Sequence, residues 1–154
     1  MFEIPVDESW RDEALRMRER GARSYLFLCV ANSARSQMAE GVARSLAPAN
    51  VTVASAGSKP TQVRPEAVAV MAEVGVDLGD HRSTSVQDVV PTDVDVVVTL
   101  CADEVCPIFP GNILRIHWGL PDPAAVTGDE AARLEAFRMV RDELQRRLAT
   151  IFAH

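Results

Sequence analysis

Short apolar runs alternate with amphipathic stretches along the chain, and this alternation predicts strands followed by helices. Four runs are rich in branched or aromatic residues: 25–30, 51–54, 93–100 and 113–116. The first of them is almost continuously apolar, which is typical of a strand covered on both faces. We therefore predict an α/β fold: a four-stranded parallel sheet with flavodoxin-like winding and helices on both faces.

Apolar residues at helical spacing predict helices over residues 9–20, after residue 36, over 65–75 and from 129 onward. In the first of these, Trp10, Ala14 and Met17 share one face, and Ser9 and Gly21 are candidate caps. No internal repeat or linker divides the rest of the chain. We expect residues 1–22 to form an N-terminal helical extension and residues 23–154 to form a single domain.

Composition and charge narrow the class of protein. The chain has 154 residues, 47% of them apolar and 25% charged, which is the profile of one folded domain. Its net charge of -6 disfavours nucleic acid as a partner. The acidic N-terminus is unlike a signal peptide and no apolar stretch is long enough for a membrane span. Three cysteines fit a reducing compartment better than a disulfide framework, so we expect a cytoplasmic protein that does not bind a membrane. We also expect it to be a monomer.

A loop whose residues suit a reactive site follows the first predicted strand. Cys29 ends this strand and Arg35 lies six positions later, where a helix begins. Backbone N–H groups at the start of a helix attract anions, and an arginine can form two parallel hydrogen bonds to a tetrahedral oxyanion. The same positive environment favours a thiolate at Cys29, to which Ser36 can donate its hydroxyl. The residues expected to bind this anion are Ala31, Asn32, Ser33, Ala34, Arg35 and Ser36.

Asn32 in this loop can hold its neighbours by hydrogen bonds or adopt a left-handed backbone. The alternative for Cys29 is a small buried residue without chemistry. The chain has no Gly-Lys pair, so a Walker-type nucleotide site is disfavoured.

The other two cysteines, Cys101 and Cys106, follow the strongest predicted strand. Because the carboxyl ends of parallel strands share one edge of a sheet, Cys101 can approach Cys29, and three thiols there suggest redox chemistry. A zinc site made by Cys101, Cys106 and His117 is a rival, but it lacks an obvious fourth ligand. Two incidental cysteines are the remaining alternative.

A proline-flanked aspartate lies after the last short strand, in the segment His117-Trp-Gly-Leu-Pro-Asp122-Pro123. The prolines limit the freedom of the loop, which suits a carboxyl group acting as a general acid. An ordinary turn aspartate is the alternative for Asp122. His117 and Trp118 are better explained by packing.

Together these motifs resemble the arsenate reductases built on the low-molecular-weight protein-tyrosine-phosphatase fold. The resemblance covers about residues 24–152 and rests on spaced motifs in the right order: Cys29 to Glu40, Ser55-Ala-Gly57, Val-Val-Thr-Leu-Cys101, Cys106-Pro and His117 to Pro123.

The resemblance implies a mechanism for arsenic detoxification. Cys29 would attack arsenate held by the loop and Arg35, while Asp122 protonates the departing oxygen. Cys101 would then attack the adduct, releasing arsenite, and Cys106 would take over in a Cys101–Cys106 disulfide that thioredoxin reduces. No bound cofactor is implied, apart from a potassium ion that some relatives bind at positions matching Asn32, Glu40 and Ser55.

The sequence departs from the family pattern in one spacing and at three positions. Four residues separate Cys101 from Cys106, where well-known thioredoxin-coupled members have six. Thr84 stands where some relatives carry an aspartate for potassium, and Ala31 and Ala34 replace a glycine and a cysteine of the loop.

Two other functions remain open. A protein-tyrosine or small-molecule phosphatase would use the same loop, although Ala124-Ala125 stands where such phosphatases have tyrosines. A non-enzymatic arsenic or zinc binder would use only the three thiols.

Overall fold

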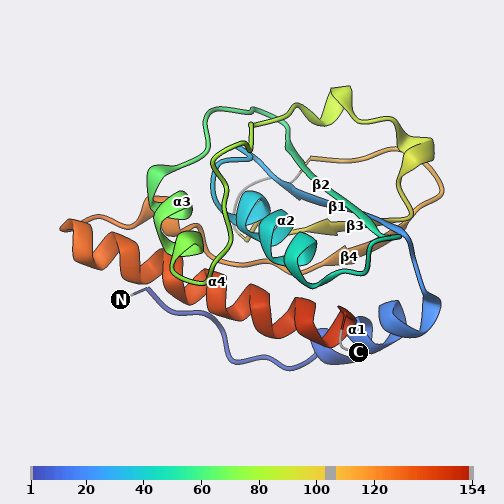
Figure 1. Ribbon diagram of the computed structural model, residues 1–154, viewed down its shortest axis with the longest axis horizontal. Helices are drawn as coiled ribbons and strands as arrows, with labels where there is room; N and C mark the ends of the chain where they lie inside the picture. Colours follow the sequence, from blue (N-terminus) through green and yellow to red (C-terminus); the bar gives the residue numbers. More distant parts are fainter. Residues whose placement is uncertain (1, 103–106, 153–154) are drawn as a thin grey trace.

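The computed structural model describes residues 2–102 and 107–152, so Cys106 lies outside the described residues. Figure 1 shows the elements along the chain, which are α1 (Trp10–Arg20), β1 (Ser24–Cys29), α2 (Arg35–Leu46), β2 (Thr52–Gly57), α3 (Pro65–Ala72), β3 (Val96–Thr99), β4 (Leu114–His117) and α4 (Glu130–Phe152). Short 3-10 helices span Val86–Asp88 (η1), Pro91–Asp93 (η2) and Pro123–Ala125 (η3).

The four strands form one parallel sheet in the order β2-β1-β3-β4, which confirms the predicted sheet and its winding. The chain leaves β1 toward β2 on one side and returns to place β3 on the other. Ligands of such sheets bind at this switch point, beyond the carboxyl ends of the strands. Cys29 lies there, paired in register with Gly57 of β2.

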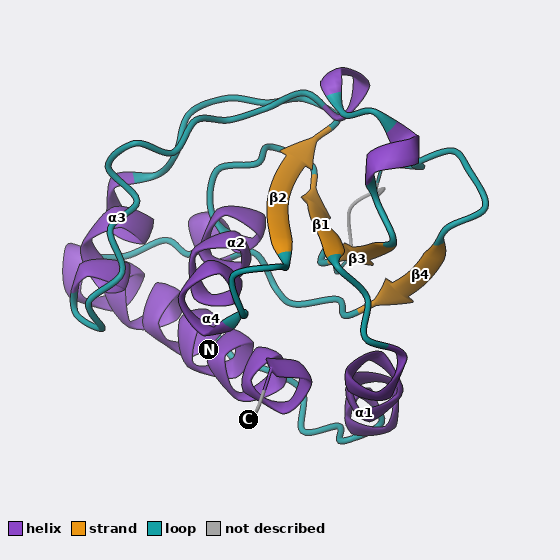
Figure 2. Ribbon diagram, turned by 45° about the vertical axis from the view of Figure 1, so that its right-hand side comes forward, coloured by secondary structure: helices purple, strands orange, loops and turns teal. Residues whose placement is uncertain are grey.

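Alternate side chains of the central strands serve two cores. Tyr25 and Phe27 face the four α-helices, which gather on one side of the sheet (Figure 2). Leu26 and Leu28 face the opposite side, where Phe109 and the segment carrying η1 and η2 cover the sheet. The prediction of helices on both faces therefore holds for the second face only through the short 3-10 helices η1 and η2, because the α-helices lie on the first. Neither of these short helices buries a residue fully, so much of that core is closed by loops.

Strand ends differ from the sequence prediction in two places. β3 begins at Val96, three residues later than the apolar run suggests, because Pro91 starts a 3-10 helix that ends at Asp93. β2 continues past Ala54 to Gly57, since its last residues pair with the final residues of β1. This extension brings Gly57 against the loop after Cys29.

Helix α1 packs along α4. Its Trp10 is 3% exposed, meets Trp118 edge-on with ring centroids 6.2 Å apart, and has the guanidinium of Arg147 over its ring. Gly21 ends the helix in a left-handed conformation, as expected of a cap, whereas Ser9 bonds to Asp7 and does not cap the helix with its side chain. Among residues 2–102 and 107–152, no helix combines the length and apolar character that crossing a bilayer requires.

Candidate active site

The loop of residues 30–34 connects β1 to α2 and curves around a small cavity. Asn32 has a φ of 49°, the left-handed conformation that asparagine tolerates better than most residues. Its buried side chain donates to Ser36 and Ser55, and its amide oxygen accepts hydrogen bonds from Gln37 and the backbone N–H of Thr84. Both properties expected of Asn32 from the sequence are thus observed together, and they hold the curve of the loop.

The carbonyl groups of the loop are bonded to neighbouring segments. Backbone N–H groups of Lys59, Thr61 and Arg64 donate to the carbonyls of Val30, Ala31 and Ser33 respectively, at 2.9, 3.0 and 2.9 Å. The carbonyl of Asn32 accepts from the side chains of Gln37 and Ser83. With these oxygens turned to other segments, the N–H groups of the loop and of the first turn of α2 remain to serve an anion.

Cys29 is a free, buried thiol at the base of this loop. Its sulfur lies 2.8 Å from the hydroxyl oxygen of Ser36. Because the amide of Asn32 already donates to this oxygen at 2.7 Å, the hydroxyl hydrogen of Ser36 is available to the sulfur. The hydroxyl of Ser36 is therefore placed to donate a hydrogen bond to the sulfur when Cys29 acts as a nucleophile.

Arg35 and Asp122 complete the walls of the cavity. The cavity measures about 190 Å³ and is lined by Cys29, Val30, Ala31, Ser33, Ala34, Arg35 and Asp122. Arg35 is 4% exposed and donates to the carbonyl of Leu120 at 2.9 Å. Its Nη2 lies 3.9 Å from a carboxylate oxygen of Asp122. A buried arginine, a thiol and a carboxyl group around one small space suit a tetrahedral oxyanion.

The loop after β4 holds Asp122 in place. One carboxylate oxygen accepts the backbone N–H of Ala124 at 2.9 Å, which begins the short helix η3 at Pro123. The other oxygen is the one nearer Arg35. Asp122 is therefore fixed by its own turn with one oxygen toward the cavity, so the turn and acid interpretations of this residue are compatible.

Cys101 lies two residues beyond β3, at the same edge of the sheet as Cys29. Leu100 donates its backbone N–H to the carbonyl of Leu28, so the chain just before Cys101 runs beside the end of β1. Cys101 is 1% exposed. The sheet thus brings the two cysteines to neighbouring strand ends, while the predicted relay partner Cys106 is outside the described residues. His117, the third rival zinc ligand, contacts Thr99 through its Nδ1 at 2.7 Å.

The three residues of the potassium hypothesis meet in one network behind the loop. Asn32 donates to Ser55, which donates to a carboxylate oxygen of Glu40 at 2.7 Å. The other carboxylate oxygen of Glu40 lies 3.0 Å from Arg44 and 3.5 Å from His81. Protein donors therefore occupy the oxygens that a potassium ion needs, and this arrangement does not fit the ion.

Sequence reasoning missed the segments that hold the loop from outside. These are residues 59–64 and the pair Ser83 and Thr84, which act mainly through backbone groups. Motifs of side chains do not reveal backbone hydrogen-bond donors. Only the turn residues at Ser55–Ser58 indicated that the chain bends near this region. Gln37, which bonds to Asn32 and to the carbonyl of Arg82, lay inside the quoted motif but received no role.

The chain is similar to known proteins, and this similarity defines its family. The family model for low molecular weight phosphotyrosine protein phosphatase matches residues 24–154. An arsenate reductase of Halalkalibacterium halodurans is 42% identical over 126 residues, covering 80% of this chain and 91% of that protein. The chain belongs to the low molecular weight phosphotyrosine protein phosphatase family, and arsenate reductases are among its relatives there.

Solved structures agree with this placement. An arsenate reductase in the phosphate binding state superposes with a TM-score of 0.73 at 35% identity, covering 85% of this chain and 97% of the other. A thioredoxin-dependent arsenate reductase of Corynebacterium glutamicum gives a TM-score of 0.60 at 28% identity, covering 88% of this chain and 67% of the other.

Proposed function

We propose that this protein is a thioredoxin-dependent arsenate reductase with Cys29 as its nucleophile. The observation that carries the proposal is the contact between Cys29 and Ser36 at the base of a cavity walled by Arg35 and Asp122. This contact offers a hydroxyl donor to the sulfur of Cys29 at the place where the loop offers N–H donors to an oxyanion. The names of the relatives support arsenate as the oxyanion, because they are called arsenate reductases.

The first step joins the substrate to the enzyme. The loop N–H groups and the guanidinium of Arg35 bind the arsenate oxygens, which places arsenic next to the sulfur of Cys29. The thiolate attacks arsenic, and one oxygen leaves as water after receiving a proton from Asp122. The product is a covalent Cys29–arsenic adduct in which arsenic is still As(V).

The second step reduces the metalloid. The thiolate of Cys101 attacks the sulfur of Cys29, so a sulfur–sulfur bond forms and the sulfur–arsenic bond breaks. The electron pair of the broken bond stays with arsenic, which leaves as As(III) arsenite. Two thiols have together lost two electrons, and the product on the protein is a Cys29–Cys101 disulfide.

The third step returns Cys29 to its starting state. The thiolate of Cys106 attacks the sulfur of Cys101, which releases the Cys29 thiolate and leaves a Cys101–Cys106 disulfide. Thioredoxin supplies two electrons to reduce this bond, and it is the partner named for the Corynebacterium glutamicum relative. We further propose, as the sequence led us to expect, that the protein works in the cytoplasm as a monomer without a bound cofactor.

A coupled assay tests the proposal. Purified protein is mixed with thioredoxin, thioredoxin reductase, NADPH and arsenate, and NADPH oxidation is followed. We expect turnover in the parent protein and none in the Cys29→Ser, Cys101→Ser or Cys106→Ser variants. In the absence of thioredoxin, the parent and Cys106→Ser should each release one arsenite per chain and then stop. Thioredoxin-dependent turnover by Cys101→Ser would refute the relay.

The phosphatase alternative is separated by a second substrate. If the loop serves phosphate ester hydrolysis, p-nitrophenyl phosphate should turn over many times in Cys101→Ser, with no arsenate-dependent NADPH oxidation in the parent protein. The described structure offers little for an aromatic ester, because η3 beside Asp122 consists of Pro123, Ala124 and Ala125. We therefore expect arsenate to be the better substrate.

A further inference from the structure

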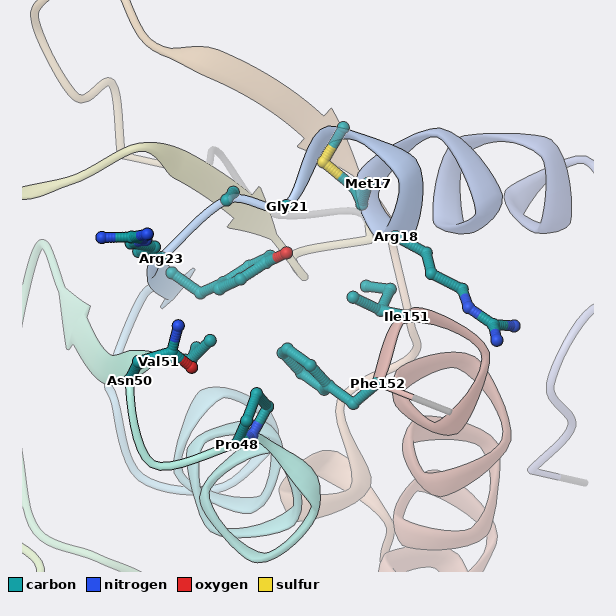
Figure 3. A pocket seen from close by; sticks show the side chains of 11 residues that line it. Met17, Arg18, Gly21, Arg23, Pro48, Asn50, Val51, Ile151 and Phe152 are labelled. Atoms are coloured by element: carbon teal, nitrogen blue, oxygen red, sulfur yellow. The ribbon is translucent and has the colours of Figure 1, made fainter. Parts of the chain in front are cut away.

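A second cavity lies at the opposite end of β1 from Cys29 (Figure 3). It measures about 340 Å³, which is within the range of small-molecule sites. The end of α1, the start of β1, the connection from α2 to β2 and the end of α4 enclose it. Arsenate reduction as proposed above makes no use of this space.

Apolar side chains, two of them aromatic, form one part of the walls of this cavity, and polar groups form the rest. Met17, Val51, Ile151 and Phe152 surround the opening in Figure 3. Tyr25 also lines it, and its ring meets that of Phe152 at a centroid distance of 5.2 Å and an angle of 74°. Such walls favour a ligand with a flat aromatic ring, which can pack against the faces and edges of these rings.

The hydroxyl group of Tyr25 is a hydrogen-bonding group in the cavity that has no partner in the described chain. Tyr25 is only 2% exposed, yet its hydroxyl forms no hydrogen bond with any residue of the described chain. Its oxygen is not sealed from solvent, because the fully buried and unpaired side-chain atoms of the described residues are those of Trp10, Arg64 and Trp118, so the hydroxyl is open to the cavity and available to a ligand. Burial, together with the charge of Asp95, raises the pKa of Tyr25 to about 12, which keeps the hydroxyl protonated as a donor at neutral pH.

Two arginines give the mouth of the cavity a positive charge. Arg18 and Arg23 line the cavity on opposite sides, and in Figure 3 their guanidinium groups point outward, away from its centre. Neither side chain forms an ion pair within residues 2–102 and 107–152, and none of the described lining residues is acidic. Asp95 lies nearby, but one of its oxygens accepts the backbone N–H of Arg23. The positive charge stands out in a chain with a net charge of -6.

We propose that this cavity binds a small aromatic carboxylate that carries an oxygen acceptor on its ring. The ring would pack between Met17, Val51 and Phe152, and the ring oxygen would accept the hydrogen bond of Tyr25. The carboxylate would reach the mouth, where the long side chain of Arg18 or Arg23 turns to meet it. This inference does not depend on the proposed function, because it concerns the other end of the sheet.

Titration with 4-hydroxyphenylacetate, followed by NMR of the isotopically labelled full chain, tests the proposal. We expect saturable shifts at the methyl groups of Met17, Val51 and Ile151. Phenylacetate, which lacks the ring oxygen, and 4-hydroxyphenethyl alcohol, which lacks the carboxylate, should each bind roughly five- to tenfold more weakly, since each loses one polar contact.

Variants link the binding to the named groups. Tyr25→Phe should weaken 4-hydroxyphenylacetate roughly five- to tenfold but leave phenylacetate unaffected, and replacing both Arg18 and Arg23 with Gln should have a comparable effect on the carboxylate probes. Arg20→Gln, on the same helix but outside this cavity, is the matched control and should change nothing. No saturable shifts at the cavity, shifts confined to the Cys29 loop, or equal binding by all variants would overturn the proposal.

Discussion

The sulfur of Cys29 lies 2.8 Å from the hydroxyl oxygen of Ser36, and this oxygen accepts a hydrogen bond from Asn32 at 2.7 Å. Because Asn32 donates to the hydroxyl oxygen of Ser36, the hydroxyl hydrogen is free to point toward the sulfur of Cys29. Three side chains therefore fix the direction of one hydrogen bond, which is donated to the sulfur of Cys29. The order of donors also explains why a serine suits position 36, since the residue must accept and donate at the same time.

Replacing Ser36 with alanine should slow the reaction of Cys29 without unfolding the protein. We expect alkylation of Cys29 by iodoacetamide at neutral pH to slow about tenfold, because one hydrogen bond to the thiolate is lost. Arsenate turnover should fall by a similar factor. Ser45→Ala is the matched control, since Ser45 is on the same helix and donates only to the carbonyl of Val42. Equal alkylation rates in the two variants would contradict the role given to Ser36.

Gly57→Ala should damage the loop more than the fold. A Cβ atom at this position would overlap the carbonyl oxygen of Val30 and come within 2.9 Å of the backbone nitrogen of Asn32. Since the loop must shift to make room, we expect arsenate turnover to fall at least about a hundredfold.

A control for Gly57→Ala is Gly21→Ala, which strains a left-handed residue but meets no atom within 4 Å. It should lower the free energy of unfolding by about 1 kcal/mol and leave turnover unchanged. Thermal unfolding and the coupled assay on both variants provide the measurement. If Gly57→Ala keeps full activity, the close approach of β2 to the loop does not shape the site.

Arsenate turnover should be insensitive to the alkali cation. Because Glu40 is already faced by Arg44 and His81, exchanging sodium for potassium at constant ionic strength should change the rate by less than about twofold. Arg44→Ala removes one of these positive groups and should make potassium activating. A strong preference of the parent protein for potassium would show that the network around Glu40 rearranges to admit the ion.

The acid stability of the protein should depend on Glu73. Hydrogen bonds from Arg138 and Arg141 lower the pKa of this carboxyl group from its ordinary 4.5 to about 2. A lowered pKa in the folded state means that the carboxylate stabilises the fold above pH 4.5 and that this stabilisation disappears as the pH falls from 4.5 to about 2.

Thermal unfolding of Glu73→Gln measures this effect. We expect the variant to melt about 1–3 °C below the parent at pH 7, with the gap narrowing in high salt because the ion pairs are exposed. The gap should close as the pH is lowered through the stated range. Glu19→Gln, which removes a carboxylate without an ion pair in the described chain, should melt like the parent at every pH. A gap for Glu73→Gln that persists at pH 2 would mean that its charge is not the cause.

The sheet was predictable because its strands are apolar runs separated by helical periodicity, and the position of Cys29 at a strand end followed from it. The start of β3 was not, since residues 93–95 continue the alternation of the strand, although Asp93 belongs to the 3-10 helix that begins at Pro91. The walls of the cavity at Cys29 were also predictable, because Arg35 and Asp122 each follow a strand.

What could not be predicted is the support of the loop by backbone groups. The backbone N–H groups of Lys59, Thr61 and Arg64 would be present with almost any side chain at these positions, so the sequence pattern carries little information about their hydrogen bonds. The cavity at Tyr25 was likewise hidden, because it needs four elements that meet only in the folded chain.

The three hydrogen bonds from residues 59–64 to the loop link the substrate site to a segment that contributes no atom to the cavity. Amides bonded in this way become exposed to solvent together when the region opens, as one cooperative unit of local unfolding. Binding of an oxyanion should therefore slow hydrogen exchange at Lys59, Thr61 and Arg64 as well as in the loop. Their exchange rates would report occupancy of the site from residues that never touch the ligand.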